Sequence, residues 1–275
     1  SWLKLELFQF PVVECGNCGL VYVNPRPTMT AMRAFYPQGY HHGRDKDAFI
    51  RRYQAQRALL PPLAGKRVLD IGCARGDFLS HLLDREAFEA FGIDASSTSV
   101  DDDRIKFTNG ILEVAKYEPV FFDLIMAWAV FEHLHRPSTY FREAARILAP
   151  GGKLIILVTN ANSLYGCVAN MEDVPRHTYH YSKSTLLVYG RKYGLQLKNL
   201  RFDDSIFDGR GNGTFRMLAG RISGFTWDKY MHNDLHLATR AAMRLGSGLD
   251  AICFATHWEA RLRRSGIMIA TYEKT

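Results

Sequence analysis

The chain has 275 residues, and its 35 lysines and arginines against 28 acidic residues give a formal net charge of +7 and a pI of about 9.2. Hydrophobic residues make up 47% of the chain, a share that excludes an intrinsically disordered protein. The apolar stretches are much shorter than the ~20 residues of a membrane span and the N-terminus lacks the pattern of a secretory signal, so we expect a soluble, cytoplasmic protein with a basic surface.

Two cysteines mark the N-terminal part of the chain. Cys15 and Cys18 lie in a turn between two strand-like runs, and the pattern resembles one knuckle of a zinc ribbon. A closed structural zinc site needs four ligands, and no second cysteine pair lies nearby, although His41 and His42 could substitute. We therefore expect residues 1–43 to form a small zinc-ribbon-like module and linker without bound zinc. The chain has five cysteines, an odd and scattered set that argues for a reducing compartment.

Residues 44–202 carry the pattern of an α/β core. A helical pattern over residues 44–60 is followed by apolar strands that alternate with helices. The predicted strands are Val68–Ile71, Phe88–Ile93, Ile105–Thr108, Phe122–Val130, Leu154–Val158 and Leu195–Phe202. The predicted helices are Phe78–Leu83, Ser138–Leu148 and Ser182–Tyr193. Continuous apolar strands between helices indicate a parallel sheet with helices on both faces.

Residues 203–265 interrupt this alternation. Apolar residues recur there at helical spacing, namely Leu235, Ala238, Ala242, Leu245, Leu249 and Ile252. We expect a helical insertion whose apolar stripe packs on a partner, with kinks at Gly246 and Gly248. The insertion would act either as a lid over the substrate or as a dimerisation helix. Residues 266–275 then return to the core as its final strand.

A glycine-bearing turn follows the first core strand. Glycines let the backbone turn sharply and let a ligand approach closely. The dinucleotide fingerprint requires glycines at positions 72, 74 and 77, but this chain has Gly72, Ala74 and Asp77. Asp77 would also place a negative charge where a pyrophosphate binds the N-terminus of a helix. The turn therefore favours a cofactor without phosphate, such as S-adenosylmethionine, over NAD.

An acidic residue ends the second core strand. Asp94 closes the sequence Gly92-Ile93-Asp94, in the position from which a carboxylate accepts hydrogen bonds from the two hydroxyls of a ribose. A solvated turn residue is the alternative interpretation of Asp94 alone. Together with the glycine turn, Asp94 indicates a nucleoside-containing cofactor.

Four segments then appear in a fixed order: Val68–Leu79, Gly92–Asp94, Phe122–His133 and Leu148–Leu154. They resemble the ordered motifs of class I S-adenosylmethionine-dependent methyltransferases, among them the ubiquinone- and menaquinone-biosynthesis group. The flanks resemble a subgroup with a zinc-ribbon-like N-terminus. The resemblance implies an α/β, Rossmann-like sheet of seven strands with the last strand antiparallel, and a small-molecule acceptor such as a sugar, a lipid or a quinone-like compound. It implies cofactor contacts at Asp70, Gly72, Cys73, Ala74, Gly76, Asp94, Ala95, Asn109, Gly110, Ile111, Ala127 and Trp128.

Three histidines are candidates for proton transfer on the acceptor side. Methyl transfer is an in-line displacement, and a general base contributes only if the acceptor must lose a proton. His133 follows the fourth core strand, and His177 and His180 lie in a polar, aromatic loop before the helix Ser182–Tyr193. Each could instead be a structural residue held by hydrogen bonds, but the close spacing of His177 and His180 in one loop favours a functional role for these two. Their place at strand ends and in a loop fits the ligand crevice of an open α/β sheet.

We expect no catalytic metal. Some ubiquinone-pathway O-methyltransferases that resemble this chain hold a divalent cation with a Glu-x-x-Glu-His cluster. Here Ala129 stands at the first position, followed by Glu132 and His133, so one oxygen ligand is missing.

Two other functions remain as alternatives. The basic charge suggests an RNA methyltransferase, but the basic residues do not cluster, so we expect no nucleic-acid partner. A non-catalytic cofactor-binding protein of the same fold is the other alternative, and the intact Gly72, Gly76 and Asp94 argue against it. A homodimer is compatible with either function.

Overall fold

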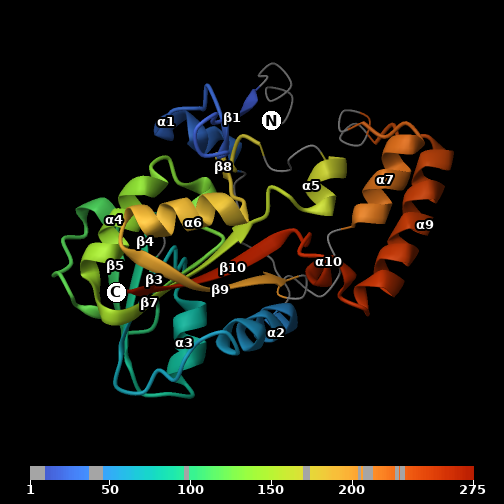
Figure 1. The fold of residues 1–275 in the computed structure, drawn as a ribbon. Coiled ribbons are helices and arrows are strands. Elements are labelled where there is room, and N and C mark those ends of the chain that lie inside the picture. Colours follow the sequence, from blue (N-terminus) through green and yellow to red (C-terminus); the bar gives the residue numbers. More distant parts are fainter. Residues whose placement is uncertain are drawn as a thin grey trace. The chain divides into compact units, whose positions relative to one another are not determined.

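Figure 1 shows the computed structural model of the chain. The structure describes residues 10–36, 46–95, 99–169, 174–203, 206, 213–226, 229 and 233–275. The chain divides into two compact units. The first unit comprises residues 1–159, 173–201 and 269–275, and the second comprises residues 160–172 and 202–268.

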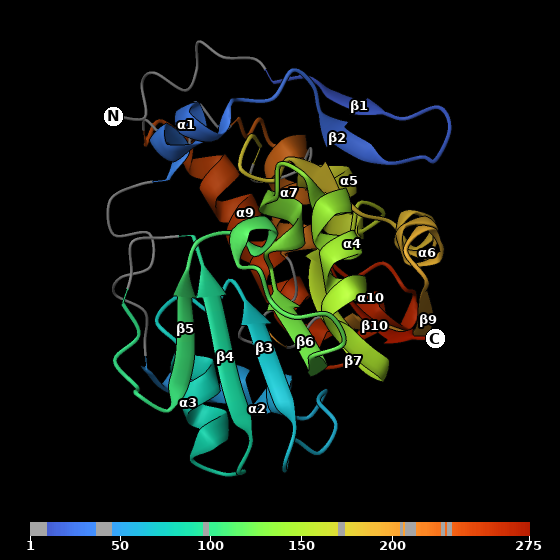
Figure 2. The same ribbon diagram turned by 90° about the vertical axis from the view of Figure 1, so that its left-hand side faces the viewer.

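A seven-stranded sheet is the centre of the fold, with the strand order β5-β4-β3-β6-β7-β10-β9. The strands are β3 (Arg67–Ile71), β4 (Glu89–Asp94), β5 (Ile105–Asn109), β6 (Phe122–Trp128), β7 (Leu148–Thr159), β9 (Leu195–Asp203) and β10 (Ile267–Lys274). Every pair from β5 to β7 is parallel, as Figure 2 shows, and the last strand is antiparallel. The Rossmann-like fold predicted from the sequence is therefore confirmed.

The central strands are apolar because both faces of the sheet are covered. In β6 the residues Leu124–Ala127 are completely buried. The neighbouring strand β7 begins at Leu148 rather than at the predicted Leu154, so Pro150, Gly151 and Gly152 belong to the strand. The register shifts between Phe122 and Leu124 of β6 absorb that irregular segment.

Helices α2 (Lys46–Arg57), α3 (Asp77–Leu83), α4 (Pro137–Ile147) and α6 (Lys183–Lys192) belong to the first unit. Helix α4 is amphipathic and buries Tyr140, Phe141, Ala144 and Ile147. The side chain of Ser182 caps the start of α6. Short 3-10 turns lie at Arg33–Phe35 (η2), Leu112–Val114 (η3) and Phe131–His133 (η4).

A second, three-stranded sheet contains the N-terminal strands. Strands β1 (Val12–Glu14) and β2 (Val21–Val23) form a hairpin, which is followed by helix α1 (Met29–Met32). Strand β2 also pairs antiparallel with β8 (Tyr179–His180), which lies much later in the chain, between β7 and α6. The sequence predicts the hairpin but not the pairing with β8, because that contact joins residues far apart in the chain.

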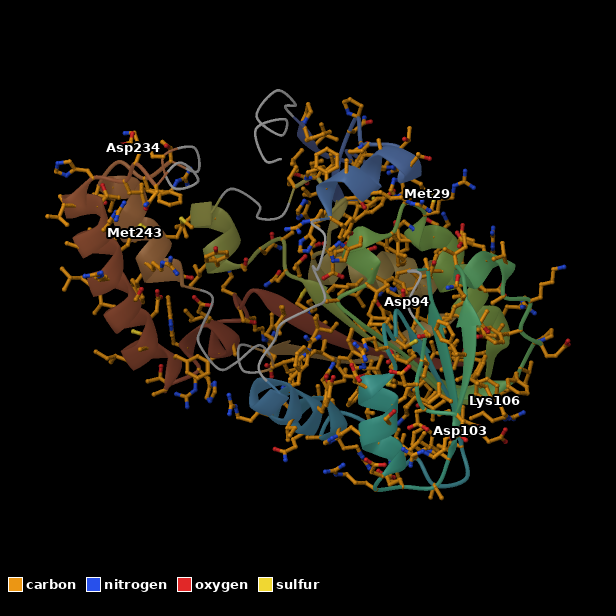
Figure 3. The ribbon with its side chains drawn as sticks, turned by 180° about the vertical axis from the view of Figure 1, so that it is seen from behind. Met29, Asp94, Asp103, Lys106, Asp234 and Met243 are labelled. Atoms are coloured by element: carbon orange, nitrogen blue, oxygen red, sulfur yellow. The ribbon has the colours of Figure 1, made fainter. Side chains whose placement is uncertain are left out.

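The second unit is mainly helical, with α5 (Leu164–Ala169), α7 (Thr214–Ile222), α9 (Leu237–Phe254) and α10 (Trp258–Arg261). Helix α9 packs on α7 through Thr239, Met243 and Gly246, which are buried, and Figure 3 labels Met243 between the two helices. No helix in the described parts of the chain is long and apolar enough to cross a membrane.

The predicted apolar stripe of this segment does not pack within the described part of the chain. Leu245 and Ile252 of α9 are 75% and 70% exposed. The helices instead meet where α9 is narrowest: a Cβ at Gly246 would lie 2.6 Å from the Cα of Arg216 in α7. Gly246 therefore permits a close helix contact rather than a kink. The role of residues 203–265 as a lid or as a dimerisation element stays a prediction.

Candidate active site

The carboxyl ends of four parallel strands bring the predicted cofactor residues to one edge of the sheet. In the strand register, Ile71 of β3 pairs with Ile93 of β4 and with Ala127 of β6, and Asp94 of β4 pairs with Asn109 of β5. Figure 3 shows Asp94 at the opposite end of the strands from Lys106. Ligands of open α/β sheets bind at this end.

The glycine turn and Asp94 are joined directly. The backbone N–H of Ala74 donates a hydrogen bond to Oδ2 of Asp94 at 2.8 Å. Gly72 has a φ of +76°, and a Cβ there would lie 2.5 Å from Cγ2 of Val130. Gly76 has a φ of +80° and begins helix α3. Both positions therefore require glycine for conformation and for space.

Ala74 occupies the same turn in a strained conformation. Its φ is +49°, in the left-handed region that glycine adopts without penalty and that a residue with a Cβ does not favour. The sequence identifies the replacement of glycine by Ala74, and the structure shows that the backbone keeps the conformation of a glycine turn.

Three buried polar atoms near this turn have no hydrogen-bond partner in the protein: Oδ1 of Asp70, Oε1 of Gln56 and Nε1 of Trp128. Asp70 is 3% exposed, and its pKa lies well above the ordinary value, first because of burial and then because of the nearby Asp94. Buried polar groups without partners are rare in folded proteins and indicate a ligand or water.

Helix α2 contributes to the same place. The positive charge of Arg52 acts on Asp70, and Gln56 follows Arg52 by one helical turn. Burial and then the negative charge of Asp77 raise the pKa of Tyr53 to about 12. The sequence does not predict any of these three residues as site residues. The feature of the sequence that could have indicated them is the presence of an arginine and a glutamine one turn apart on the half-buried face of this helix.

The other predicted cofactor residues differ in exposure. Cys73 is buried, with its sulfur so close to Gly92 that a Cβ on the glycine would lie 2.8 Å away, and burial raises the pKa of its thiol. Ala127 is completely buried, whereas Ala95 is exposed. Gly110, with a φ of +148°, and Ile111 follow β5. Cys73 and Ala127 can therefore offer only their backbone to a ligand.

The three candidate histidines lie together. The ring centroids of His133 and His177 are 4.6 Å apart, and those of His177 and His180 are 6.4 Å apart. Burial lowers the pKa of His180 to about 4. The pKa of His177 falls to about 2, mainly through burial and then through His133, His180 and Arg176. His177 and His180 are therefore neutral at physiological pH and are poor proton acceptors.

The surroundings of His133 define its tautomer. Its Nδ1 lies 3.1 Å from the backbone carbonyl of Arg176 and 3.3 Å from the hydroxyl of Tyr36. A carbonyl oxygen only accepts hydrogen bonds, so Nδ1 carries the proton. Nε2 of the neutral ring then keeps its lone pair and can act as a base.

Glu132, His133 and His177 form the one group of potential metal ligands found in the described part of the chain, with ligand atoms within 4.8 Å of one another. The absence of a catalytic metal stays a prediction. Cys15 and Cys18 belong to no such group among the residues that the structure describes. His41 and His42 lie outside the described residues.

Residues 40–200, more than half of the chain, match a protein family described as a methyltransferase domain. The ubiquinone biosynthesis O-methyltransferase of Azoarcus sp. (strain BH72) is 30% identical over 158 residues, which cover 50% of this chain and 67% of that protein. The protein of the same name from Stutzerimonas stutzeri (strain A1501) is 27% identical over 158 residues, 50% of this chain and 68% of the relative.

Solved structures share the fold. The S-adenosylmethionine-dependent methyltransferase from Mesorhizobium loti superposes with a TM-score of 0.52 at 15% identity, covering 80% of this chain and 96% of its own. Geranyl diphosphate methyltransferase in complex with SAM superposes with a TM-score of 0.53 at 13% identity, covering 82% and 85%. At these identities the likeness concerns the fold alone.

Proposed function

We propose a specific reaction for this chain, which belongs to the methyltransferase-domain family and is an S-adenosylmethionine-dependent methyltransferase. In this proposal the protein methylates a hydroxyl group of a quinone-like small molecule, and His133 is the general base. The observation that carries the proposal is the hydrogen bond between Nδ1 of His133 and the carbonyl of Arg176, because it leaves the lone pair of the neutral ring on Nε2, in the turn that follows the end of β6.

The residues at the cofactor edge fit S-adenosylmethionine. Asp94 would bind the ribose hydroxyls, and the Gly72–Gly76 turn has space for a close backbone approach. The unpartnered oxygens of Asp70 and Gln56 would accept hydrogen bonds from the ammonium group, and Arg52 would pair with the carboxylate. Asn109, Gly110 and Ile111 would lie along the adenine. When bound, the cofactor supplies an electrophilic methyl group on a sulfonium.

His133 performs the proton transfer in this proposal. The acceptor hydroxyl would donate its proton to Nε2 of His133 as the oxygen becomes nucleophilic. His177 and His180 are held neutral by burial and would line the site rather than exchange protons. Because Ala129 supplies no carboxylate beside Glu132 and His133, the hydroxyl would be activated by the base alone.

The acceptor class follows from the relatives. The curated proteins that this chain resembles are named for ubiquinone biosynthesis and for O-methylation, which supports a phenolic, quinone-like acceptor. Sugar and lipid hydroxyls are the other small-molecule acceptors compatible with the same chemistry. An RNA acceptor would need a cluster of basic residues that the sequence does not contain.

An acceptor panel tests the proposal. The purified protein is incubated with S-adenosylmethionine and hydroxybenzoates, catechols, nucleotide sugars or lipid hydroxyls, and methylated products are identified by mass spectrometry. We expect products from the phenols, and His133→Gln should lower kcat by roughly 10²–10⁴-fold, the usual contribution of a general base. Full activity of His133→Gln would refute its role, and product from a sugar or lipid alone would refute the quinone-like acceptor.

A further inference from the structure

The N-terminal strands contact the segment that carries His177 and His180, here called the acceptor segment (residues 174–181). We propose that the N-terminal residues 21–36 are a working part of the acceptor site and that Tyr36 is the positioning residue for His133. The inference rests on the proposed function only where it assigns the proton transfer to His133. It departs from the sequence-based expectation of a separate zinc-ribbon-like module.

Backbone hydrogen bonds join the two segments. Strand β2 pairs with β8, with Val21 opposite His180 and Tyr22 opposite Tyr179. The N–H of Val23 donates to the carbonyl of Thr178 at 3.0 Å. The acceptor segment is therefore one strand of the N-terminal sheet.

The opposite side of the acceptor segment is bound to the turn that carries His133. The N–H of Thr178 donates to the carbonyl of Glu132 at 2.8 Å, and its hydroxyl donates to the carbonyl of Leu134 at 3.0 Å. Thr178 is completely buried. It lies between β2 and η4, so a displacement of β2 would be transmitted to His133 through a packed, hydrogen-bonded contact.

A closed ring of side-chain contacts reinforces this arrangement. The guanidinium of Arg26 donates to the hydroxyl of Tyr179 at 2.6 Å and lies over the ring of that tyrosine. The hydroxyl of Tyr179 donates to the carbonyl of His135, and Nε2 of His135 donates to the carbonyl of Pro27 at 3.0 Å. The ring thus leads from the N-terminal module through the acceptor segment to the His133 turn and back.

Tyr36 completes the contact at the base itself. Its hydroxyl lies 3.3 Å from Nδ1 of His133, the same nitrogen that bonds the carbonyl of Arg176, and the guanidinium of Arg176 lies over the ring of Tyr36. With the proton on Nδ1, the hydroxyl accepts from the same N–H as the carbonyl, and this second acceptor favours the Nδ1–H tautomer and holds the orientation of the ring. The chemical consequence is that the proton stays on Nδ1 and Nε2 keeps its lone pair.

The tautomer of His133 is a direct readout that requires no acceptor. Two-bond ¹H–¹⁵N correlation spectra of the full chain with S-adenosylhomocysteine bound distinguish the Nδ1–H from the Nε2–H form. We expect the Nδ1–H form in the wild type and a measurable Nε2–H population in Tyr36→Phe. Tyr193→Phe is the matched control, because its ring stacks on Phe141, and its spectrum should match the wild type.

Two further measurements separate the possible outcomes. If Tyr36→Phe fails to fold, Arg26→Met serves as the second variant. It breaks the ring of contacts between the N-terminal residues and the turn that carries His133, and it should give the same spectral change. Once the panel identifies an acceptor, Tyr36→Phe should lower kcat roughly five- to tenfold, the effect of one lost hydrogen bond, and shift its pH profile while cofactor affinity is unchanged. An unchanged His133 spectrum in Tyr36→Phe and Arg26→Met would overturn the inference, whereas an active His133→Gln would overturn the proposed function alone.

Discussion

The cofactor edge and the acceptor segment differ in how the chain supplies their side chains. The cofactor edge is formed by residues at the ends of three successive strands: the glycine turn follows β3, Asp94 ends β4 and Asn109 ends β5. Their positions depend on the backbone conformation of those strand ends. The proposed acceptor side is assembled from three distant segments, namely residues 21–36, 131–135 and 174–181. Contiguous motifs therefore describe the first region well, and only long-range contacts describe the second.

The largest effect on the cofactor edge should come from removing the carboxylate of Asp94. We expect Asp94→Ala to weaken the binding of S-adenosylmethionine by roughly 1.5–3 kcal/mol, the usual contribution of hydrogen bonds to a charged group. Titration calorimetry measures it, with NAD as the control ligand. Tight NAD binding, or a wild-type affinity in Asp94→Ala, would contradict the assignment of this edge to a ribose.

Acidification should affect the acceptor side more than the cofactor edge. Burial lowers the pKa of His180 from about 6.5 to about 4 in the folded protein, so protonation favours the unfolded chain. The resulting stability is complete above pH 6.5 and is lost as the pH falls toward 4, with a free-energy change on the order of 3 kcal/mol.

Urea unfolding at a series of pH values measures this loss. His180→Gln removes the titrating group, so the free energy of unfolding of this variant should vary less between pH 6.5 and 4 than that of the wild type. Equal pH dependence in both proteins would show that His180 is not held neutral by the fold.

A smaller effect is expected in the glycine turn. Ala74 has a left-handed φ of +49°, which glycine adopts without strain, so Ala74→Gly should raise the free energy of unfolding by up to about 1 kcal/mol. Thermal unfolding measures it, with Ala95→Gly as a control at an exposed alanine. A destabilised Ala74→Gly would mean that the side chain contributes packing that outweighs the strain.

No effect is expected from metal removal. Treatment with EDTA should leave the methyl transfer rate and the elemental analysis unchanged, since Ala129 supplies no oxygen ligand beside Glu132 and His133. A rate that falls with EDTA and returns with a divalent cation would assign the group Glu132, His133 and His177 to a metal. One zinc per chain would instead show that Cys15 and Cys18 bind zinc together with two further ligands that the sequence analysis did not identify.

The sequence by itself determined the fold and the family, because apolar periodicity specifies buried parallel strands and because Gly72 and Gly76 are needed at positive φ whatever surrounds them. It also identified three candidate histidines and favoured His177 and His180, because these two lie close together in a polar, aromatic loop. The tertiary structure distinguishes them differently, because burial lowers the pKa of His177 and His180, while the carbonyl of Arg176 assigns the proton to Nδ1 of His133.

Other features depended on the tertiary structure for the same physical reason. Whether Leu245 is buried, or whether Gln56 meets a partner, depends on which element packs against its helix, and helical periodicity does not contain that information. The pairing of β2 with β8 joins residues more than 150 positions apart, since Val21 lies opposite His180. Strands as short as these, of three and two residues, carry too little pattern to specify a distant partner, so their position is decided by the packed core around them.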